Sequence, residues 1–444
     1  MIIRIKKDEA IFILLSIVNI LVILFTDKGY LSYLIFVVLL TAKMHKGINN
    51  EKFLLYALFI PNKYLQLFAI PLYLLFTGSL LRPRFSKKAI ILIIYVTVFG
   101  VFNCLVYNGF IISTLFQIGV YYCTLVMIKS FDRNLDIKIA FTIFNKMFYL
   151  QFITVILQII ITRGIGDNIK GTLISAHYLG VYLLIYIYML LKVKSVILLN
   201  WRKYINIVLA IAIFILADAK HIFIVFVIAY LIAFVFKKLH IKNRLTVFGI
   251  CMIIGTILVL NLSQSNVYNG LFLNKYIAPY IYNVNYNKKY MYLLNTMEKM
   301  KSWNGVFGFG VGQFGSQISI TMSKGIIYDW NPSLSIYNHA IGPFATAING
   351  LMTEWYTTYG ILISSMVMGY PLISFVGMVA ELGLFGYLLF LNVFDSYFKE
   401  KNVTFIIAFL LLTVFDTYLE IPCVFIVILI ASYMIQKRGK LIIT

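Results

Sequence analysis

The sequence contains a series of apolar runs long enough to cross a lipid bilayer. A membrane-spanning helix needs about 20 mainly apolar residues. The runs that meet or approach this length cover residues 10–25, 30–42, 89–107, 110–128, 147–162, 172–191, 245–262 and 375–394. Because 61% of the 444 residues are hydrophobic and only 12% are charged, a water-soluble fold cannot bury the apolar side chains. We therefore expect an all-α polytopic membrane protein.

Three further apolar stretches are each longer than one span but shorter than two. They cover residues 53–77, 205–236 and 404–435, and polar residues interrupt each near its middle: Asn62 and Lys63, then Asp218 to His221, then Asp416 to Glu420. As helical hairpins, their legs would run about 9 to 15 residues, or about 14 to 22 Å, against a hydrocarbon core of about 30 Å. The polar apices should then lie below the outer membrane surface, in a cavity lined by protein.

The distribution of charge predicts the orientation. Lys plus Arg number 38 against 16 Asp plus Glu, which gives a formal net charge of +22. Lys and Arg collect in cytoplasmic loops, and the basic clusters fall on one side of the membrane only if every interrupted stretch is a hairpin. We therefore expect 12 to 14 transmembrane helices, with both termini cytoplasmic, in a multi-pass protein of the cytoplasmic (inner) membrane. The excess of Lys and Arg reflects the orientation of the chain in the membrane, so we expect no nucleic-acid partner.

The same topology divides the chain into three parts. Residues 1–262 form an N-terminal transmembrane bundle, residues 263–374 form one large extracytoplasmic loop, and residues 375–444 form the C-terminal transmembrane segments. The loop contains a predicted amphipathic helix at residues 288–303, followed by a glycine-rich turn. No internal repeat is visible, and the single large loop makes the two halves unlike, which argues against a transporter built from matched halves.

Lys220 is the most informative cation in the sequence. An ionisable residue inside a membrane segment is costly and is a functional candidate by default, although an ion pair with Asp218 is a purely structural alternative. His221 either donates to the same anion or caps the turn. Lys288, Lys289 and Arg163 are among the few bases placed outside, against the usual bias, so each is a candidate for holding an anion such as a diphosphate or is an ordinary surface charge. Lys220, Lys288, Lys289 and Arg163 are therefore the candidate residues for binding such an anion.

Three acidic residues are candidates for a catalytic base. Asp416 and Glu420 are four residues apart, so they share one face of a helix, and Glu381 enters the last long span near its outer end. Each can accept a proton from a sugar hydroxyl. Each can equally be a structural counter-ion for a cation such as Lys220, and the sequence leaves both roles open.

Glycines and a histidine in the outer loop are auxiliary candidates. Gly310-Val-Gly312-Gln-Phe-Gly315 matches a dinucleotide fingerprint in its letters, but no strand precedes it, so we reject a nucleotide site. The segment is either a flexible turn or a backbone that closely approaches a phosphate or sugar. His339 in the same loop is either catalytic or incidental. No Cys and His spacing suits a metal, and we expect no cofactor.

The order of these features resembles the polytopic O-antigen polymerase and ligase family, which includes capsule and exopolysaccharide polymerases. The resemblance covers roughly residues 205–435. In that family a basic residue follows a polar break in a hydrophobic stretch, an outer loop carries a base, an aromatic helix and a Gly-x-Gly-x-Gly turn, and the next span opens with a Glu-Leu-Gly-x-x-Gly pattern. The matching residues here are Lys220; then Lys289, residues 288–303 and Gly308 to Phe314; then Glu381, Gly383 and Gly386.

The resemblance implies a polymerase that joins oligosaccharide repeat units linked to undecaprenyl diphosphate at the outer face of the membrane. Lys220, Lys288, Lys289 and Arg163 would bind the diphosphate. The family often has Arg at positions 220 and 289, whereas Lys contacts phosphate only as a point charge. The resemblance names a flippase and a chain-length regulator as candidate partners, besides the lipid-linked oligosaccharide and the bilayer.

Three alternatives remain from the sequence. A flippase for lipid-linked oligosaccharides would also be basic, Tyr-rich and 12 to 14 spans long. A ligase-type glycan transferase belongs to the same family, but ligases carry a His shortly before the Glu-x-Gly motif, where this chain has Leu372 and its neighbours. A small-group transferase would need an activated-donor site on the inner face, and the sequence shows none. The polymerase is the expectation that these comparisons favour.

Overall fold

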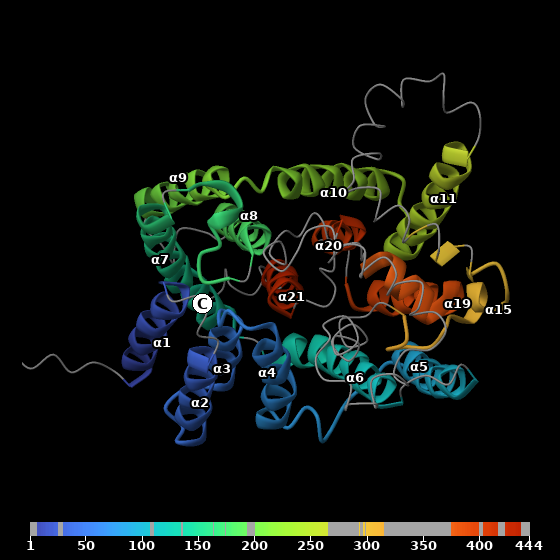
Figure 1. Ribbon diagram of the computed structural model, residues 1–444, viewed down its shortest axis with the longest axis horizontal. Helices are drawn as coiled ribbons and strands as arrows, with labels where there is room; N and C mark the ends of the chain where they lie inside the picture. Colours follow the sequence, from blue (N-terminus) through green and yellow to red (C-terminus); the bar gives the residue numbers. More distant parts are fainter. Residues whose placement is uncertain are drawn as a thin grey trace, which may run out of the picture.

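The computed structural model describes residues 7–24, 30–106, 111–134, 136–162, 164–173, 175–192, 200–264, 293, 296–297, 299–314, 374–398, 403–415 and 422–436. Within these ranges the regular elements are helices and no strand occurs. Figure 1 shows them: α1 (Lys7–Leu24), α2 (Tyr30–Met44), α3 (Asn50–Ala57), α4 (Lys63–Phe76), α5 (Lys87–Val106), α6 (Ile111–Asn134), α7 (Ile137–Thr162), the 3-10 turn η1 (Gly166–Asn168), α8 (Ala176–Lys192), α9 (Asn200–Leu216), α10 (Lys220–Lys238), α11 (Arg244–Gln264), α15 (Trp303–Phe307), α19 (Ser374–Tyr397), α20 (Val403–Phe415) and α21 (Pro422–Gln436). The predicted all-α class is confirmed.

Five of the described helices are long and apolar enough to cross a membrane: α5, α6, α7, α10 and α19. They differ in how much protein surrounds them. In α19, 78% of the apolar window is buried inside the protein, whereas in α10 the figure is 17%. Side chains that no protein covers on α10, such as Phe223, Ile224 and Leu231, are apolar, which suits a helix surrounded by lipid. The chain is therefore a helical membrane protein with α19 at its centre and α10 at its periphery.

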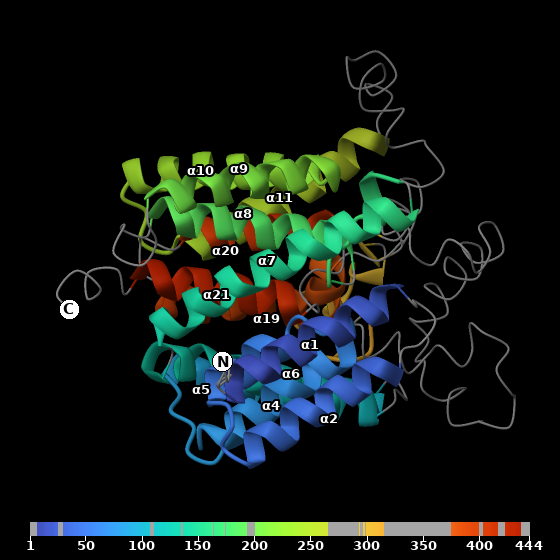
Figure 2. The same cartoon turned by 90° about the vertical axis from the view of Figure 1, so that its left-hand side faces the viewer.

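The C-terminal helices form the middle layer of the bundle. Figure 2 shows α19, α20 and α21 between a layer that contains α1 to α6 and a layer that contains α8 to α11. On one side α19 packs against α5, and α21 packs against α4 and α6. On the other side α19 packs against α11, α20 against α10, and α21 against α8. The last helices of the chain therefore hold the two N-terminal layers together.

The first interrupted stretch is a buried helical hairpin. The short helix α3 packs against α4, and the connecting residues Leu58, Phe59 and Ile60 are buried. The side-chain amide of Gln66 donates to the carbonyls of Leu58 at 2.9 Å and Ile60 at 2.8 Å. The Asn62 side chain caps α4 by accepting from the Tyr64 N–H. Because α3 has 8 residues and α4 has 14, neither spans about 30 Å of hydrocarbon, in agreement with the predicted short legs.

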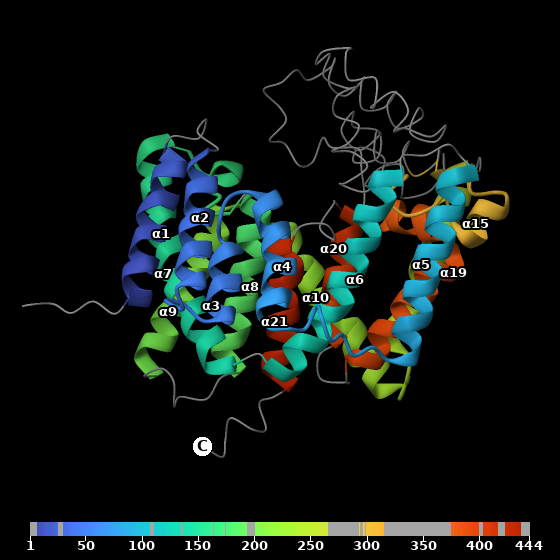
Figure 3. The same ribbon diagram turned by 90° about the horizontal axis from the view of Figure 1, so that it is seen from below.

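The second interrupted stretch differs from the prediction. It breaks at Ala217–Ala219 as expected, but α9 has 17 residues and α10 has 19, about 26 and 28 Å at 1.5 Å per residue. The prediction of shorter legs is wrong because residues such as Trp201 and Arg202 interrupt the apolar run without ending the helix. Figure 3 shows α9 and α10 apart, each among different neighbours: α9 packs against α8, while α10 packs mainly against α20. Lys220 therefore lies closer to the end of a full-length span than the sequence suggests.

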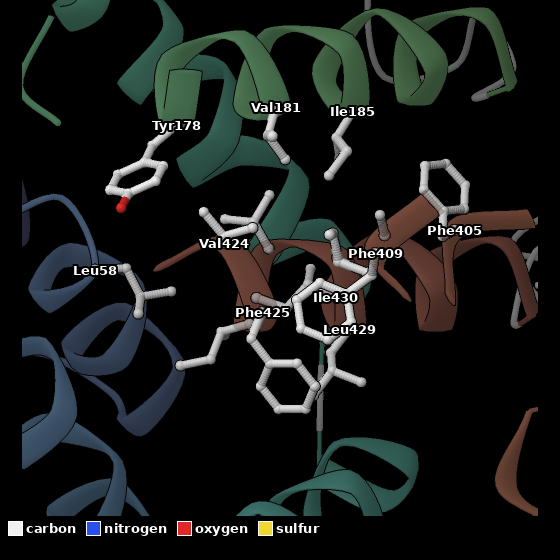
Figure 4. Close-up of a cluster of buried hydrophobic side chains, with 14 of the residues drawn as sticks. Leu58, Tyr178, Val181, Ile185, Phe405, Phe409, Val424, Phe425, Leu429 and Ile430 are labelled. Carbon is white, nitrogen blue, oxygen red and sulfur yellow. The ribbon is translucent and has the colours of Figure 1, made fainter. Parts of the chain in front are cut away.

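The α3–α4 break and the starts of α8 and α21 pack around a common apolar core. Figure 4 shows Leu58 from the α3–α4 break facing Tyr178 and Val181 of α8 and Val424 of α21. A small apolar cavity of about 10 Å³ lies between them and is also lined by Leu173. In the third interrupted stretch α20 ends at Phe415 and α21 begins at Pro422; Asp416 and Glu420 lie outside the described residues. The start of α8, the first break and the start of α21 therefore meet around one small cavity.

Replacing Gln66 by Leu should destabilise the protein, because the buried Leu58 carbonyl loses the donor that the structure gives it, while the Ile60 carbonyl keeps the Asn62 N–H and the volume changes little. An unsatisfied buried carbonyl costs about 1 to 3 kcal/mol. We expect a clear fall in the melting temperature of the purified protein in detergent. Phe68→Leu on the same helix is the control, since Phe68 is 64% exposed. Equal melting temperatures for the two variants would contradict the bridging role of Gln66.

Candidate functional site

The break between α9 and α10 has a defined local structure. Asp218 adopts a left-handed backbone conformation, with φ of 51°, which Asp and Asn tolerate better than most residues. Ala219 is buried against α8, where a Cβ added to Gly180 would lie 2.6 Å from the Ala219 Cβ. Only a glycine allows the break to approach α8 so closely. Packing of Ala219 against α8 thus holds the break on one side, and the side chains of Asp218 and Lys220 are exposed.

Lys220 forms the ion pair with Asp218 that the sequence leaves open. Its Nζ lies 2.9 Å from Asp218 Oδ1, and the two side chains are 83% and 55% exposed. An exposed ion pair of this kind contributes about 0 to 1 kcal/mol. The pairing does not exclude anion binding, because an incoming diphosphate can replace the carboxylate at little cost.

Two histidines and a loop lie beside this ion pair. The ring of His221 packs edge-to-face against His177 of α8, with centroids 4.4 Å apart. The loop between α7 and α8 lies on the other side, where a Cβ added to Gly166 would be 4.0 Å from the Asp218 Cβ. The same loop carries Lys170, which is half-buried. The Lys220–Asp218 ion pair, the imidazoles of His177 and His221 and the backbone of the α7–α8 loop therefore meet at the α9–α10 break.

Two glutamines in α7 fix the loop that carries Lys170. The side-chain carbonyl of Gln158 accepts from the N–H groups of Lys170 and Gly171, at 3.1 and 3.0 Å, and that of Gln151 accepts from the Thr172 N–H at 2.7 Å. Both glutamines are buried. Sequence reasoning missed them and His177. A signal existed for the glutamines, because their spacing of seven residues places them on one face of an otherwise apolar helix.

The other predicted motifs meet at a second break, inside α19. Gly383 has φ of 68° and ψ of 173°, which interrupts the helix. The carbonyls freed there find partners: the Phe309 N–H donates to Ala380 at 2.8 Å and the Gly310 N–H to Glu381 at 3.2 Å. The Tyr95 hydroxyl of α5 donates to the Leu382 carbonyl at 2.6 Å. The glycine-rich turn and the Glu-Leu-Gly motif, about seventy residues apart in sequence, are in direct contact.

The glycine-rich turn, residues 308–314, is packed into the bundle. Gly308, Gly310 and Gly312 all have positive φ, and a Cβ on Gly312 would lie 2.5 Å from the Ser113 carbonyl oxygen of α6. Phe309, Val311 and Phe314 are buried. The close approach expected of these glycines occurs, but toward α5, α6 and α19. The backbone N–H groups of Gly310 and Gly312 both donate to Glu381, so in this structure they are engaged within the protein. The auxiliary roles predicted for the two glycines stay predictions.

Glu381 anchors the turn. Its side chain is 2% exposed; Oε2 accepts from the Gly312 N–H at 2.9 Å and Oε1 from the Phe314 N–H at 3.0 Å. Hydrogen bonds to a charged group are stronger than neutral ones, at about 1.5 to 3 kcal/mol each. Both carboxylate oxygens are thus engaged by fixed donors. This geometry favours a positioning role for Glu381 over a role as the base.

The remaining predicted site residues lie outside the described part of the chain. These are Arg163, Lys288, Lys289, His339, Asp416 and Glu420. Of the predicted residues that are described, Lys220 and His221 share one break, whereas Glu381, Gly310 and Gly312 share the other. In the described ranges no group of three or more His, Cys, Asp or Glu side chains is placed to hold a metal ion.

Substitutions at the second break should be destabilising and coupled. Gly312→Ala places a Cβ against Ser113 in a backbone conformation unfavourable for Ala, and Glu381→Gln replaces one acceptor by an amide NH₂. We expect each to cost about 2 to 3 kcal/mol, and the double variant to cost much less than the sum, because both changes release the same contact. The measurement is melting temperature in detergent. Gly255→Ala is the control, since a Cβ there meets nothing within 4 Å. Additive losses would contradict the coupling.

Comparison with protein-family models, with curated proteins and with solved structures finds no match to this chain.

Proposed function

We propose that this chain is a glycosyltransferase that polymerises oligosaccharide repeat units linked to undecaprenyl diphosphate, for a surface polysaccharide such as O-antigen, capsule or exopolysaccharide. The observation that carries the proposal is Lys220, a cation at a helix break on the periphery of the bundle. Its side chain is 83% exposed, and within the described part of the chain it forms an ion pair with Asp218. Lys220 can therefore contact the diphosphate of a lipid that stays in the bilayer.

The surface around Lys220 suits a lipid-linked substrate. On α9, Ile211 and Ile215 are 45% and 68% exposed, and on α10 Phe223 and Ile224 are about half exposed. A polyprenyl chain can lie along these apolar faces while its diphosphate reaches the α9–α10 break. The apolar faces of α9 and α10 then contact the polyprenyl chain, while Lys220 attracts the diphosphate of the same molecule.

The proposed reaction needs a cation and a base. A hydroxyl oxygen of the incoming repeat unit bonds to the anomeric carbon of the growing chain, and the bond between that carbon and the diphosphate oxygen breaks. The diphosphate leaves with the electron pair, and Lys220 stabilises the charge that develops on it. The hydroxyl proton passes to a carboxylate. Asp416 and Glu420 are the candidates, since they follow α20, the main packing partner of α10, whereas Glu381 holds the glycine-rich turn.

The proposed topology is that of a multi-pass protein of the cytoplasmic membrane with 12 to 14 spans and both termini cytoplasmic. The distribution of basic residues along the helices supports it. Lys87 begins α5, Lys237 and Lys238 end α10, and Arg244 begins α11, which are all ends assigned to the cytoplasm by the positive-inside rule. Lys220 begins α10 at the opposite end, on the side where flipped repeat units would arrive.

A flippase is the main alternative. Many transporters alternate their access by moving two matched halves or bundles against each other. Here α19 to α21 lie between the two N-terminal layers and pack against both (Figure 2). In addition, the Tyr95 hydroxyl of α5 donates a hydrogen bond to the Leu382 carbonyl of α19. This arrangement favours a fixed catalytic frame over two moving halves.

Deleting the protein from a producing cell separates the two functions. A polymerase mutant should accumulate single lipid-linked repeat units at the outer face of the membrane, where an added glycosidase or lectin reaches them. Units trapped at the inner leaflet would instead establish the flippase and refute the polymerase. Complementation with the wild-type chain is the control.

Two substitutions at the α9–α10 break test the diphosphate role. Lys220→Ala should abolish chain extension while membrane level and melting temperature stay unchanged, because the ion pair that is lost is exposed and weak. Asp218→Asn removes the competing carboxylate but keeps a residue that tolerates positive φ, so extension should persist with a lower KM for the lipid-linked unit. Lys238→Ala, at the other end of α10, is the matched control. Polymer of normal length from Lys220→Ala would refute the assignment.

A further inference from the structure

Two histidine rings from different helices meet beside the Lys220–Asp218 ion pair. His177 is the second residue of α8, and His221 is the second residue of α10. Their ring centroids lie 4.4 Å apart, and the ring planes are inclined by 76°. His177 is 5% exposed, whereas His221 is half-buried. The buried ring therefore supports the other ring, which stays accessible at the break.

The other contacts between α8 and the break are apolar. A Cβ added to Gly180 of α8 would lie 2.6 Å from the Ala219 Cβ and 3.4 Å from the Ile222 Cδ1, and Ala219 and Ile222 are both fully buried. Packing at this contact is thus supplied by aliphatic groups on both sides of His221. Packing alone does not require two imidazoles, which can also donate and accept hydrogen bonds.

The start of α8 that carries His177 is fixed by hydrogen bonds of its own. The Ser175 hydroxyl accepts from the His177 N–H at 3.2 Å. Upstream, the buried Gln151 side chain accepts from the Thr172 N–H at 2.7 Å and donates to the Thr172 hydroxyl. These bonds lie within α7, α8 and the loop that joins them. His177 is therefore a fixed support against which a side chain of α10 can be oriented.

His221 lies next to the cation of the proposed diphosphate site. In an α-helix the Cα–Cβ bonds tilt toward the N-terminus, so the side chains of Lys220 and His221, the first two residues of α10, both extend toward the break. A lysine contacts phosphate as a point charge on a flexible stem and does not fix its orientation. An imidazole N–H is directional, and the ring that carries it here is held by His177. The break therefore offers a flexible charge and a fixed donor side by side.

We propose that the His221 imidazole donates a hydrogen bond to the diphosphate that Lys220 holds, and that His177 is a positioning residue, which fixes the His221 ring for this contact. The inference rests on the proposed polymerase function, because the diphosphate is the leaving group of that reaction. Negative charge grows on the diphosphate as its bond to the anomeric carbon breaks, so a fixed donor acts mainly in the transition state. The loss of His221 should therefore lower kcat more than it raises KM.

Substitutions at His221 test the donor. The assay is chain extension by the purified full-length protein, with lipid-linked repeat units extracted from a strain that lacks it. His221→Phe keeps a ring against His177 but has no donor, so kcat should fall about tenfold or more, with a smaller change in KM. The amides of His221→Asn and His221→Gln reach the positions of the two ring nitrogens, and one of these variants should recover part of the rate. Tyr230→Phe, further along α10 and 61% exposed, is the control. An unchanged kcat for His221→Phe would overturn the proposal.

Substitutions at His177 test the positioning role. His177→Ala removes the supporting ring and should lower kcat as much as His221→Phe does, whereas His177→Phe restores a ring and should recover most of the rate. Because His177 acts through His221, the double variant His177→Ala/His221→Phe should be no slower than His221→Phe alone. A ring that only stabilised the fold would lower the melting temperature and leave the kcat of the folded protein unchanged. That result, or equal kcat for His177→Phe and His177→Ala, would overturn the positioning role.

A binding measurement separates this inference from the proposed function. Undecaprenyl diphosphate carries its diphosphate in the form that leaves, so His221→Phe should weaken its binding to the full-length protein about tenfold. Equal Kd values for the wild type and His221→Phe, together with weaker binding by Lys220→Ala, would overturn the role of His221 and leave the polymerase intact. Repeat units trapped at the inner leaflet of the deletion strain would instead refute the polymerase, and with it the leaving-group role of His221.

Discussion

A helix that breaks inside an apolar bundle frees backbone groups that no water can satisfy, so each break needs a partner from elsewhere in the chain. At the α3–α4 break the partner is the Gln66 amide, which bridges two carbonyls. At the α7–α8 loop it is a pair of buried glutamines. At the α19 break it is the glycine-rich turn together with Tyr95. At the α3–α4 break and the α7–α8 loop the partner lies close by in the sequence, whereas at the α19 break it ties two distant segments, α5 and the glycine-rich turn, to the helix that it completes.

The interactions that hold the breaks differ in strength. This difference separates the break that stabilises the bundle from the break that is proposed to bind substrate. The turn at α19 is held by a buried carboxylate that accepts two N–H groups, at about 1.5 to 3 kcal/mol for each bond. The ion pair at the α9–α10 break is exposed on both sides and contributes about 0 to 1 kcal/mol. A site that must bind and release an anion needs a partner that can be exchanged. Only the second kind of contact meets that requirement, which is why Lys220 and not Glu381 carries the proposed chemistry.

The sequence predicts the helical membrane class and the positions of the α3–α4 and α9–α10 breaks because both depend on local composition, whereas it does not predict the break at Gly383 inside α19. It misjudges the length of α9, since Trp201 and Arg202 end an apolar run without ending a helix. For Gly310 and Gly312 it predicts a close approach of the backbone but not the partner, because a glycine indicates that something packs closely without identifying the segment that does so. The contact between His177 and His221 joins segments more than forty residues apart. No pattern along one chain encodes such a contact, which arises only when α8 and α10 pack.

The position of Glu381 limits where the base of the proposed reaction can be. To take a proton, its carboxylate would have to give up a hydrogen bond from Gly312 or Phe314, and the turn would lose its anchor between α5, α6 and α19. A base is better placed on a segment whose movement disturbs no buried contact and whose helix already packs beside the cation. α20 packs against α10 more extensively than any other described helix does, and Asp416 is the next residue after α20. The base of the proposed reaction is therefore expected near the break that carries Lys220 and not at the centre of the bundle.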